Sequence, residues 1–280
     1  MNCRTRSFRW VLLAALPVTL AAGLAACSSD DAGPTKSTAA ITTSVPTLPE
    51  GADQLVGRYA HFDVVAYEDK TMKTVIISTG FSDLTLRKGV MWNQMTFCHA
   101  DTALDQDVDV SISDAATQAI KPVATPVEVT AVDGKLHVSR PATPTGIGIK
   151  LADPAHDVLP SDPKDPRIFD ADGDGHPGVT STVRVTKDFS GQIYLARREI
   201  FAYDLTQQTP DRLVGTVTDH SEQVILGASD PAFLTPAQWK QLDDPKRNPV
   251  IWQRVDDDMD CAGLARQRAR LFPPNPKADW

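Results

Sequence analysis

Apolar and polar side chains alternate with a period of two over most of the chain from residue 57 to residue 227. Such alternation is typical of β-strands that bury one face, and the segments are also rich in β-branched and aromatic residues. The segments that we predict to be strands are 57–69, 72–79, 81–88, 90–99, 107–113, 126–132, 135–140, 145–151, 179–186, 191–205 and 212–227. Asp133-Gly134, between two of them, is a strong β-hairpin signal. The pattern predicts a mainly β fold, a barrel-like or sandwich domain of about ten short strands.

Helical patterns come late in the chain. In 230–244, Thr235 is a plausible N-cap and Pro236 follows it at the first helical position. In 260–272, Asp260 is the expected N-cap, and the apolar residues that follow it recur at helical spacing. We therefore expect one or two C-terminal helices beside the strands.

The first residues have the layout of a secretory signal. Three arginines precede an apolar run over 10–22, which is too short for a stable membrane span. The next residues, Leu24-Ala25-Ala26-Cys27, resemble the lipobox of bacterial lipoproteins. That resemblance implies a signal peptide over 1–26 and a lipid on Cys27. The alternative is an ordinary cleaved signal in which Cys27 has no special role.

The segment 27–50 is rich in Ser, Thr, Ala, Asp and Pro and has almost no large apolar residues. It cannot bury enough surface to offset the entropy of the chain, so we predict a flexible tether. The remainder, 51–280, is long enough for a single β-rich domain with its own core. Ser28 after the cysteine favours sorting to the outer membrane. We therefore expect a lipid-anchored protein of the cell envelope that faces the periplasm or the cell surface.

The net charge of the chain argues against two classes of partner. The chain holds 28 basic and 36 acidic residues, for a formal net charge of −8, and loss of the signal arginines makes the remainder more acidic. An acidic surface argues against nucleic acid as a partner and against electrostatic docking on anionic lipid. The expected membrane contact is the N-terminal lipid anchor, and the sequence does not identify a protein or small-ligand partner.

Cysteine usage predicts one disulfide. Cys3 leaves with the signal and Cys27 carries the lipid, so Cys98 and Cys261 remain as a pair in an oxidising compartment. The alternative is two buried free thiols. His99 follows Cys98 directly, but neighbours along a strand point to opposite faces, which argues against a catalytic cysteine.

The segment "IFDADGDGHPGVT" (168–180) carries the most specific chemistry. Asp170, Asp172 and Asp174 stand at positions one, three and five of a D-x-D-x-D-G loop. His176 is at position seven, where such loops supply a backbone carbonyl. Carboxylate and carbonyl oxygens suit Ca²⁺, and Mg²⁺ requires a tighter octahedron. We therefore predict a structural calcium site. The alternatives are a solvated acidic turn without metal and catalysis by an aspartate pair.

The loop differs from an EF-hand. Position twelve is Ser181, where an EF-hand has a bidentate glutamate, and the chain enters a predicted strand directly afterwards. This argues against a helix–loop–helix calcium sensor. Water could complete the site, as could Asp162 or Asp165 just upstream.

A resemblance to known proteins rests on this loop and on two further runs. "DPRIFDADGDGHPGVTSTVRV", "SEQVILGAS" and "DCAGLARQRARLF" resemble uncharacterised bacterial lipoproteins that carry a single D-x-D-G-D-G-x-P-G-x-T loop within an all-β domain. The resemblance extends over much of the chain from Gly57 onward. It implies lipoprotein status and a calcium loop, and it implies no known activity.

No further motif specifies catalysis. The histidines form neither H-x-H nor H-E-x-x-H, and the sequence has no G-x-S-x-G, S-x-x-K or Walker loop. Gly57-x-Tyr59 resembles the start of lipocalin-like barrels, which hold one small apolar ligand. The main hypothesis is a binding or structural protein that takes a hydrophobic ligand, and the alternative is a periplasmic hydrolase with an unrecognised active site. A histidine, an acidic group and a nucleophile within hydrogen-bond reach would favour the hydrolase.

Overall fold

The fold is an antiparallel sheet of twelve strands that curls into a barrel. It was obtained as a computed structural model, which describes residues 47–234 and 239–280. The predicted signal peptide, Cys27 and most of the predicted tether lie outside the described residues. The strands are β1 (Gly57–Glu68), β2 (Lys73–Arg87), β3 (Val90–Leu104), β4 (Asp109–Ile112), β5 (Thr125–Val132), β6 (Lys135–Ile147), β7 (Val179–Thr186), β8 (Phe189–Thr209), β9 (Arg212–Asp219), β10 (Glu222–Ala228), β11 (Lys240–Gln241) and β12 (Pro249–Arg254). The expected mainly β fold is confirmed.

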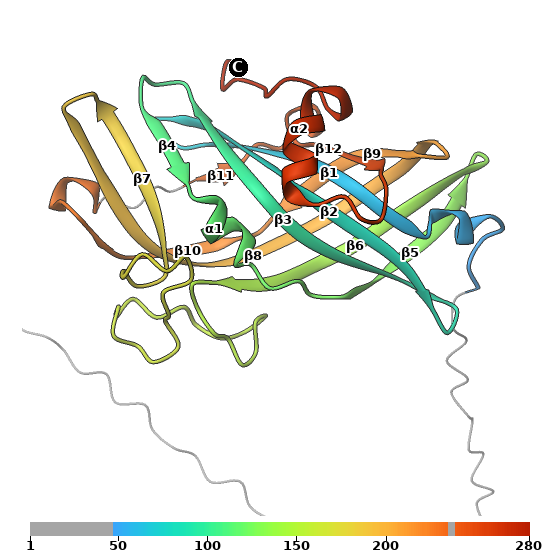
Figure 1. Ribbon diagram of the computed structural model, residues 1–280, viewed down its shortest axis with the longest axis horizontal. Helices are drawn as coiled ribbons and strands as arrows, with labels where there is room; N and C mark the ends of the chain where they lie inside the picture. The colour runs from blue at the N-terminus through green and yellow to red at the C-terminus, as the bar shows by residue number, and fades with distance from the viewer. Residues whose placement is uncertain (1–46, 235–238) are drawn as a thin grey trace, which may run out of the picture. The chain divides into compact units, whose positions relative to one another are not determined.

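Eight of the strands close into a ring. Pairing runs from β1 through β2, β3, β5, β6, β8, β9 and β12 and returns to β1, antiparallel at every step. Strands β4, β7 and β10 extend the wall at one end, because β4 bridges β3 to β7, and both β7 and β10 pair with β8. Figure 1 shows this extension at the end of the molecule opposite the β5–β6 turn.

Several predicted strand boundaries are wrong. The segments 72–79 and 81–88 form one strand, β2, which runs through Gly80. A Cβ on Gly80 would lie 2.0 Å from the Thr96 carbonyl oxygen of β3, so the glycine permits close approach and does not break the strand. Likewise β6 continues beyond residue 140, and 212–227 divides into β9 and β10. The Asp133-Gly134 turn is confirmed, with φ of 52° and 74° as a type I′ hairpin requires.

The two predicted helices have different outcomes. Helix α2 (Cys261–Leu271) is confirmed, and Asp260 caps it by accepting a hydrogen bond from the Gly263 amide at 2.6 Å. Of the helix predicted over 230–244, the expected cap residues Thr235 and Pro236 lie outside the described residues, and the described parts are not α-helical. The described part of that segment holds a single 3₁₀ turn, η2 (Pro231–Phe233), and then the short strand β11. Pairing of β11 with β1 satisfies the backbone there, and the Gln241 side chain bonds the backbone of β9.

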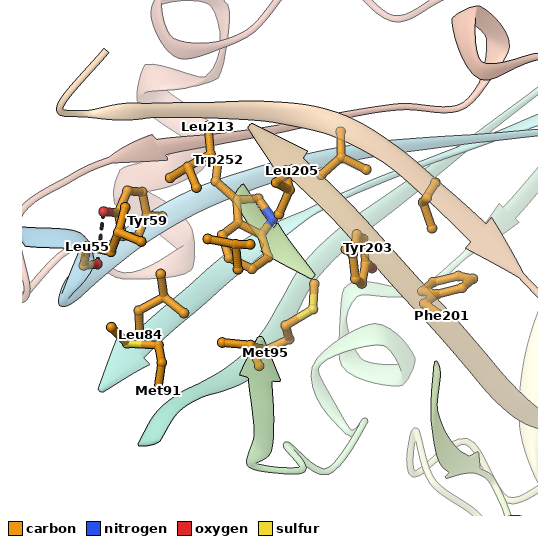
Figure 2. Packing of buried hydrophobic residues seen from close by; sticks show 14 of the residues in the cluster. Leu55, Tyr59, Leu84, Met91, Met95, Phe201, Tyr203, Leu205, Leu213 and Trp252 are labelled. Carbon is orange, nitrogen blue, oxygen red and sulfur yellow. Dashed lines mark hydrogen bonds between the residues drawn. The ribbon is translucent and has the colours of Figure 1, made fainter. Parts of the chain in front are cut away.

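Both faces of β1 are buried. Alternate residues from Tyr59 to Tyr67 point into the barrel, and Ala60, Phe62 and Val64 point outward. Tyr59 packs in the interior with Trp252 and Leu213, as Figure 2 shows. The outward residues pack beneath α2 and the C-terminal segment, where the Phe62 and Phe272 rings stack at 5.4 Å. Almost every side chain of β1 is therefore buried, on one face or the other.

The predicted Cys98–Cys261 disulfide is confirmed, with Cα atoms 5.4 Å apart. Cys98 lies at a bulge in β3, where the pairing with β2 shifts between Thr79 and Gly80. It joins the apolar cluster beneath α2, where Cys261 is the first helical residue. The bond therefore fixes the start of α2 to the outside of the barrel.

In the part of the chain that the structure describes, no helix has the length and apolar character that crossing a membrane requires.

Candidate functional site

The aspartate loop from Asp170 to Gly178 leads into β7 and is closed at its base by the backbone. The Ala171 amide donates to the Gly178 carbonyl at 2.9 Å, and the Gly178 amide donates to the Phe169 carbonyl at 3.1 Å. Gly173 and Gly175 both have positive φ, at 76° and 88°, which lets the chain turn sharply between the aspartates. The sequence pattern thus becomes a compact turn with a fixed base.

The three aspartates of this loop converge. One carboxylate oxygen from each of Asp170, Asp172 and Asp174 lies within 4.8 Å of the others, so the group could hold a metal ion. Asp170 also accepts from the backbone amides of Gly173 at 2.7 Å and Gly175 at 2.9 Å. These hydrogen bonds, the Gly175 amide foremost, hold the pKa of Asp170 below its usual value, so this carboxylate stays charged.

The Asp172 carboxylate links the loop to β7. Its Oδ2 accepts from the Thr180 amide at 3.0 Å, and its Oδ1 is buried without a hydrogen-bond partner among the described residues. A buried carboxylate oxygen without a partner is costly, and a cation would satisfy it. The oxygen chemistry of the loop therefore fits a hard metal ion.

The other residues that the sequence suggested as metal ligands do not place their side chains with the three aspartates. Asp165 forms an ion pair with Arg167 at 3.0 Å, and Asp162 accepts from the Lys164 amide, so neither joins the three aspartates. The His176 ring stacks on Tyr194, with centroids 4.0 Å apart. The ring is thus occupied elsewhere, and the metal contact by the His176 carbonyl stays a prediction.

A cavity of about 130 Å³ lies in the barrel interior, at the end that β4 and β7 extend. Its wall is mostly apolar and includes Ile76, Phe97, Ala116, Ile147 and Leu195. Ser111, an exposed residue of β4, also lines it, so the cavity reaches the surface there. Helix α1 (Asp114–Gln118), which the sequence pattern did not predict, supplies Ala116.

The aspartate loop supports the wall of this cavity. Ala171, between the first two aspartates, packs in one apolar cluster with Ala116, Ile147 and Leu195. All three of these partners also line the cavity. The order of the loop and the shape of the cavity are therefore physically connected.

Two charged residues of β8 interrupt the apolar lining. Arg197 and Glu199 point inward between Leu195 and Phe201, and each side chain is only 14 % exposed. Arg197 Nε lies 3.7 Å from Glu199 Oε2, and Arg197 Nη2 lies 3.7 Å from Asp219 Oδ2. The sequence carried a signal for them, because they occupy inward positions of an otherwise apolar alternation in 191–205. Neither residue was among the predicted site residues.

A deeper polar layer lies next to these charges. The Tyr203 hydroxyl donates to Asp63 at 2.9 Å, and both groups are enclosed. Burial raises the pKa of Asp63 to about 7 and that of Glu199 to about 7. Burial lowers the pKa of His61 to about 3, so His61 is neutral at ordinary pH. The middle of the barrel thus holds ionisable groups between an apolar core and an apolar cavity.

Replacing Asp63 by Asn should reduce the dependence of stability on pH. The folded protein keeps a proton on Asp63 up to pH 7, whereas the unfolded chain releases it near pH 4, so the free energy of unfolding falls as pH rises between these values. At about 1.4 kcal/mol per pKa unit, the variant should lose roughly 3 kcal/mol less than the wild type between pH 4 and pH 7. Urea unfolding at a series of pH values measures this.

Asp204→Asn is the matched control, because Asp204 is exposed on β8 next to Tyr203. It should leave the pH profile of the wild type unchanged. Glu199 contributes a slope of the same sign and His61 one of opposite sign, and both remain in the variant. Superimposable profiles for Asp63→Asn and wild type would show that Asp63 is ionised in the folded protein at low pH.

The described lining of the cavity contains no histidine. His61, in the neighbouring polar layer, has no hydrogen-bond partner among the described residues. Elsewhere His99 bonds Asp114 and Asp101, and His137 bonds Thr206. Within the described ranges, no hydrogen-bonded set of side chains combines a nucleophile, a histidine and an acid. The described residues thus form a mostly apolar cavity beside an acidic loop.

Comparison with known proteins found no relative. No family model, no curated protein and no solved structure matches the chain.

Proposed function

We propose that this protein binds a small, largely apolar ligand inside its β-barrel, as a lipid-anchored component of the cell envelope whose aspartate loop holds a structural calcium ion. The observation that carries the binding function is the cavity of about 130 Å³ with its mostly apolar wall. An apolar wall with a few polar groups is typical of small-molecule sites, although this cavity is smaller than most of them.

The size of the cavity limits the ligand. An engineered apolar cavity of about 150 Å³ accepts benzene, so a ring or a short alkyl chain matches the space here. Long-chain lipids are too large for it. The ligand class is therefore a molecule with one small apolar body, and benzyl alcohol is a suitable soluble probe.

Partly filling the cavity should weaken binding. Ala116 is buried and lines the cavity, and Leu at this position would occupy part of the ligand volume. We expect Ala116→Leu to weaken benzyl alcohol binding about tenfold or more, the loss of roughly 1.4 kcal/mol of binding free energy. Chemical-shift titration of the methyl groups of Ile147 and Leu195 measures the affinity.

Ala115→Leu is the control, because Ala115 is exposed on the same helix. It should bind benzyl alcohol as the wild type does. Equal affinity in Ala116→Leu and Ala115→Leu would place any binding outside the cavity. The absence of titrating methyl signals in the wild type would reject the ligand-binding function.

Calcium in the aspartate loop is supported by the hard oxygen donors and by the buried unpartnered oxygen of Asp172. A structural ion stabilises the fold by mass action, by about 2.7 kcal/mol when its concentration is a hundred times the dissociation constant. EGTA should therefore lower the melting temperature of the wild type by several degrees. Asp172→Ala should melt at the lower temperature with or without EGTA.

Asp188→Ala is the control, since Asp188 is an exposed aspartate in the turn after β7. Its response to EGTA should equal that of the wild type. Equal melting temperatures in calcium and in EGTA would reject the calcium site. Recovery by Mg²⁺ to the same degree as by Ca²⁺ would change the identity of the ion.

The lipid anchor is supported by the sequence before Cys27, and an expected sorting to the outer membrane by Ser28. Cys27→Ala should move the protein from the membrane fraction to the soluble fraction of the cell. Retention of the variant in membranes would contradict the anchor. The alternative function, a periplasmic hydrolase, would require a nucleophile hydrogen-bonded to a histidine, and none of the described lining residues is a histidine.

A further inference from the structure

Arg197 presents unused hydrogen-bond donors to the cavity. Its side chain lines the cavity, and its ion-pair distances to Glu199 and Asp219 are both 3.7 Å, longer than a hydrogen bond. Among the described residues, the Tyr67 hydroxyl is the side-chain hydrogen-bond partner of the Arg197 guanidinium, and neither acid is close enough for a hydrogen bond, so most of the donors stay free. A guanidinium has five N–H donors, and a buried one gains strongly from an oxygen acceptor.

The neighbouring acids do not take up these donors. The Asp219 carboxylate accepts from the Tyr67 hydroxyl at Oδ2 and from the Ser221 amide at Oδ1, so both of its oxygens already have partners. Glu199 is buried, and its pKa of about 7 means that a large fraction is uncharged at neutral pH. Arg140, from β6, is a second buried cation outside the lining of this cavity; its Nη1 donates to the Phe201 carbonyl at 3.0 Å, and its Nε has no hydrogen-bond partner among the described residues. The acids therefore leave donors of Arg197 free for one more negative group.

Resting on the ligand-binding function proposed above, we propose that the natural ligand is a small monocarboxylate, whose carboxylate contacts Arg197 and whose apolar body lies against Phe97, Ile147 and Leu195. Arginine binds carboxylates through two parallel N–H donors, which also fixes the orientation of the ligand. The apolar residues exclude water around this contact and so strengthen it. A cationic amine would lie against Arg197 and be repelled, and a neutral alcohol would gain no charge-assisted hydrogen bond.

Three probes with the same ring and different head groups test this proposal. Benzoate, benzyl alcohol and benzylamine are titrated into the full-length protein near pH 6, where benzoate is ionised. We expect benzoate to bind about tenfold or more tightly than benzyl alcohol, and benzylamine to bind most weakly. Arg197→Gln should bind benzoate and benzyl alcohol equally. Arg184→Gln, an exposed arginine on β7, should keep the preference of the wild type.

The outcomes separate this inference from the function on which it rests. Equal binding of benzoate and benzyl alcohol to the wild type would overturn the carboxylate inference and leave the apolar cavity as the binding site. Tightest binding of benzylamine would overturn it in favour of recognition by Glu199 and Asp219. Binding of none of the three would overturn both. If Arg197→Gln does not fold, Arg197→Lys, which keeps the charge, should retain part of the preference, and the probe series on the wild type still decides.

Discussion

Removing the disulfide by Cys98→Ala together with Cys261→Ala is expected to lower the free energy of unfolding by up to about 5 kcal/mol. The two cysteines are 163 residues apart in sequence, and a cross-link across so long a loop strongly restricts the unfolded chain. The bond also holds the start of α2 against the outward face of β1 and β2, where Leu264 and Phe272 are buried. Guanidinium unfolding of oxidised protein measures the change.

The reducing agent provides the control for this experiment. Reduction should shift the unfolding midpoint of the wild type toward that of the double variant, and should leave the double variant unchanged. A thiol count on the denatured, unreduced wild type should find neither Cys98 nor Cys261 free. Identical midpoints for wild type and double variant would contradict a stabilising role for the bond.

The second large effect is expected from Trp252→Ala, at about 3–5 kcal/mol of destabilisation. Trp252, on β12, is fully buried in the barrel interior between Tyr59 and Tyr203, with ring centroids 6.3 Å and 6.2 Å away. Figure 2 shows the indole among the residues of this cluster. Truncation would leave a large cavity that the closed ring of strands cannot collapse to fill. Urea unfolding monitored by circular dichroism measures the loss.

Two further variants serve as comparisons for Trp252→Ala. Trp252→Phe keeps an aromatic ring and removes an indole N–H that has no hydrogen-bond partner among the described residues, so it should cost less than Trp252→Ala. Trp92→Ala removes a half-buried tryptophan on β3 that contacts Arg87, and should cost about 1 kcal/mol or less. Equal losses for Trp92→Ala and Trp252→Ala would contradict the interior position of Trp252.

Local signals in the sequence were sufficient for the elements that depend on local chemistry. The alternation over 179–186 predicted β7 with its bounds, and Asp260 predicted the first turn of α2. Asp133-Gly134 predicted a turn that needs left-handed backbone at two residues. The spacing of Asp170, Asp172 and Asp174 predicted that their carboxylates converge, because each lies within a few residues of the others. Cysteine number and compartment predicted the disulfide.

Features that depend on distant strands could not be predicted in this way. In the sequence, Gly80 looks like a break between two strands. Its actual role, close contact with Thr96, depends on the pairing of β2 with β3. Lys240 and Gln241 belong to a segment with a helical pattern, but pairing with β1 makes these two residues a strand. Arg197 and Glu199 are alternate residues of one strand, and only closure of the ring places them in a cavity. The sequence shows which residues share a face and does not show what that face meets.

Strand β8 determines how the domain unfolds. Its first half is hydrogen-bonded to β7 and β10, and its second half to β6 and β9, so one unbroken segment of 21 residues belongs to both the ring and its extension. The extension therefore cannot unfold separately from the ring. Calorimetry should record a single cooperative transition. Amide exchange in β8 should be slowed to a similar degree along its length, so that an ion held at the start of β7 would protect protons deep in the barrel.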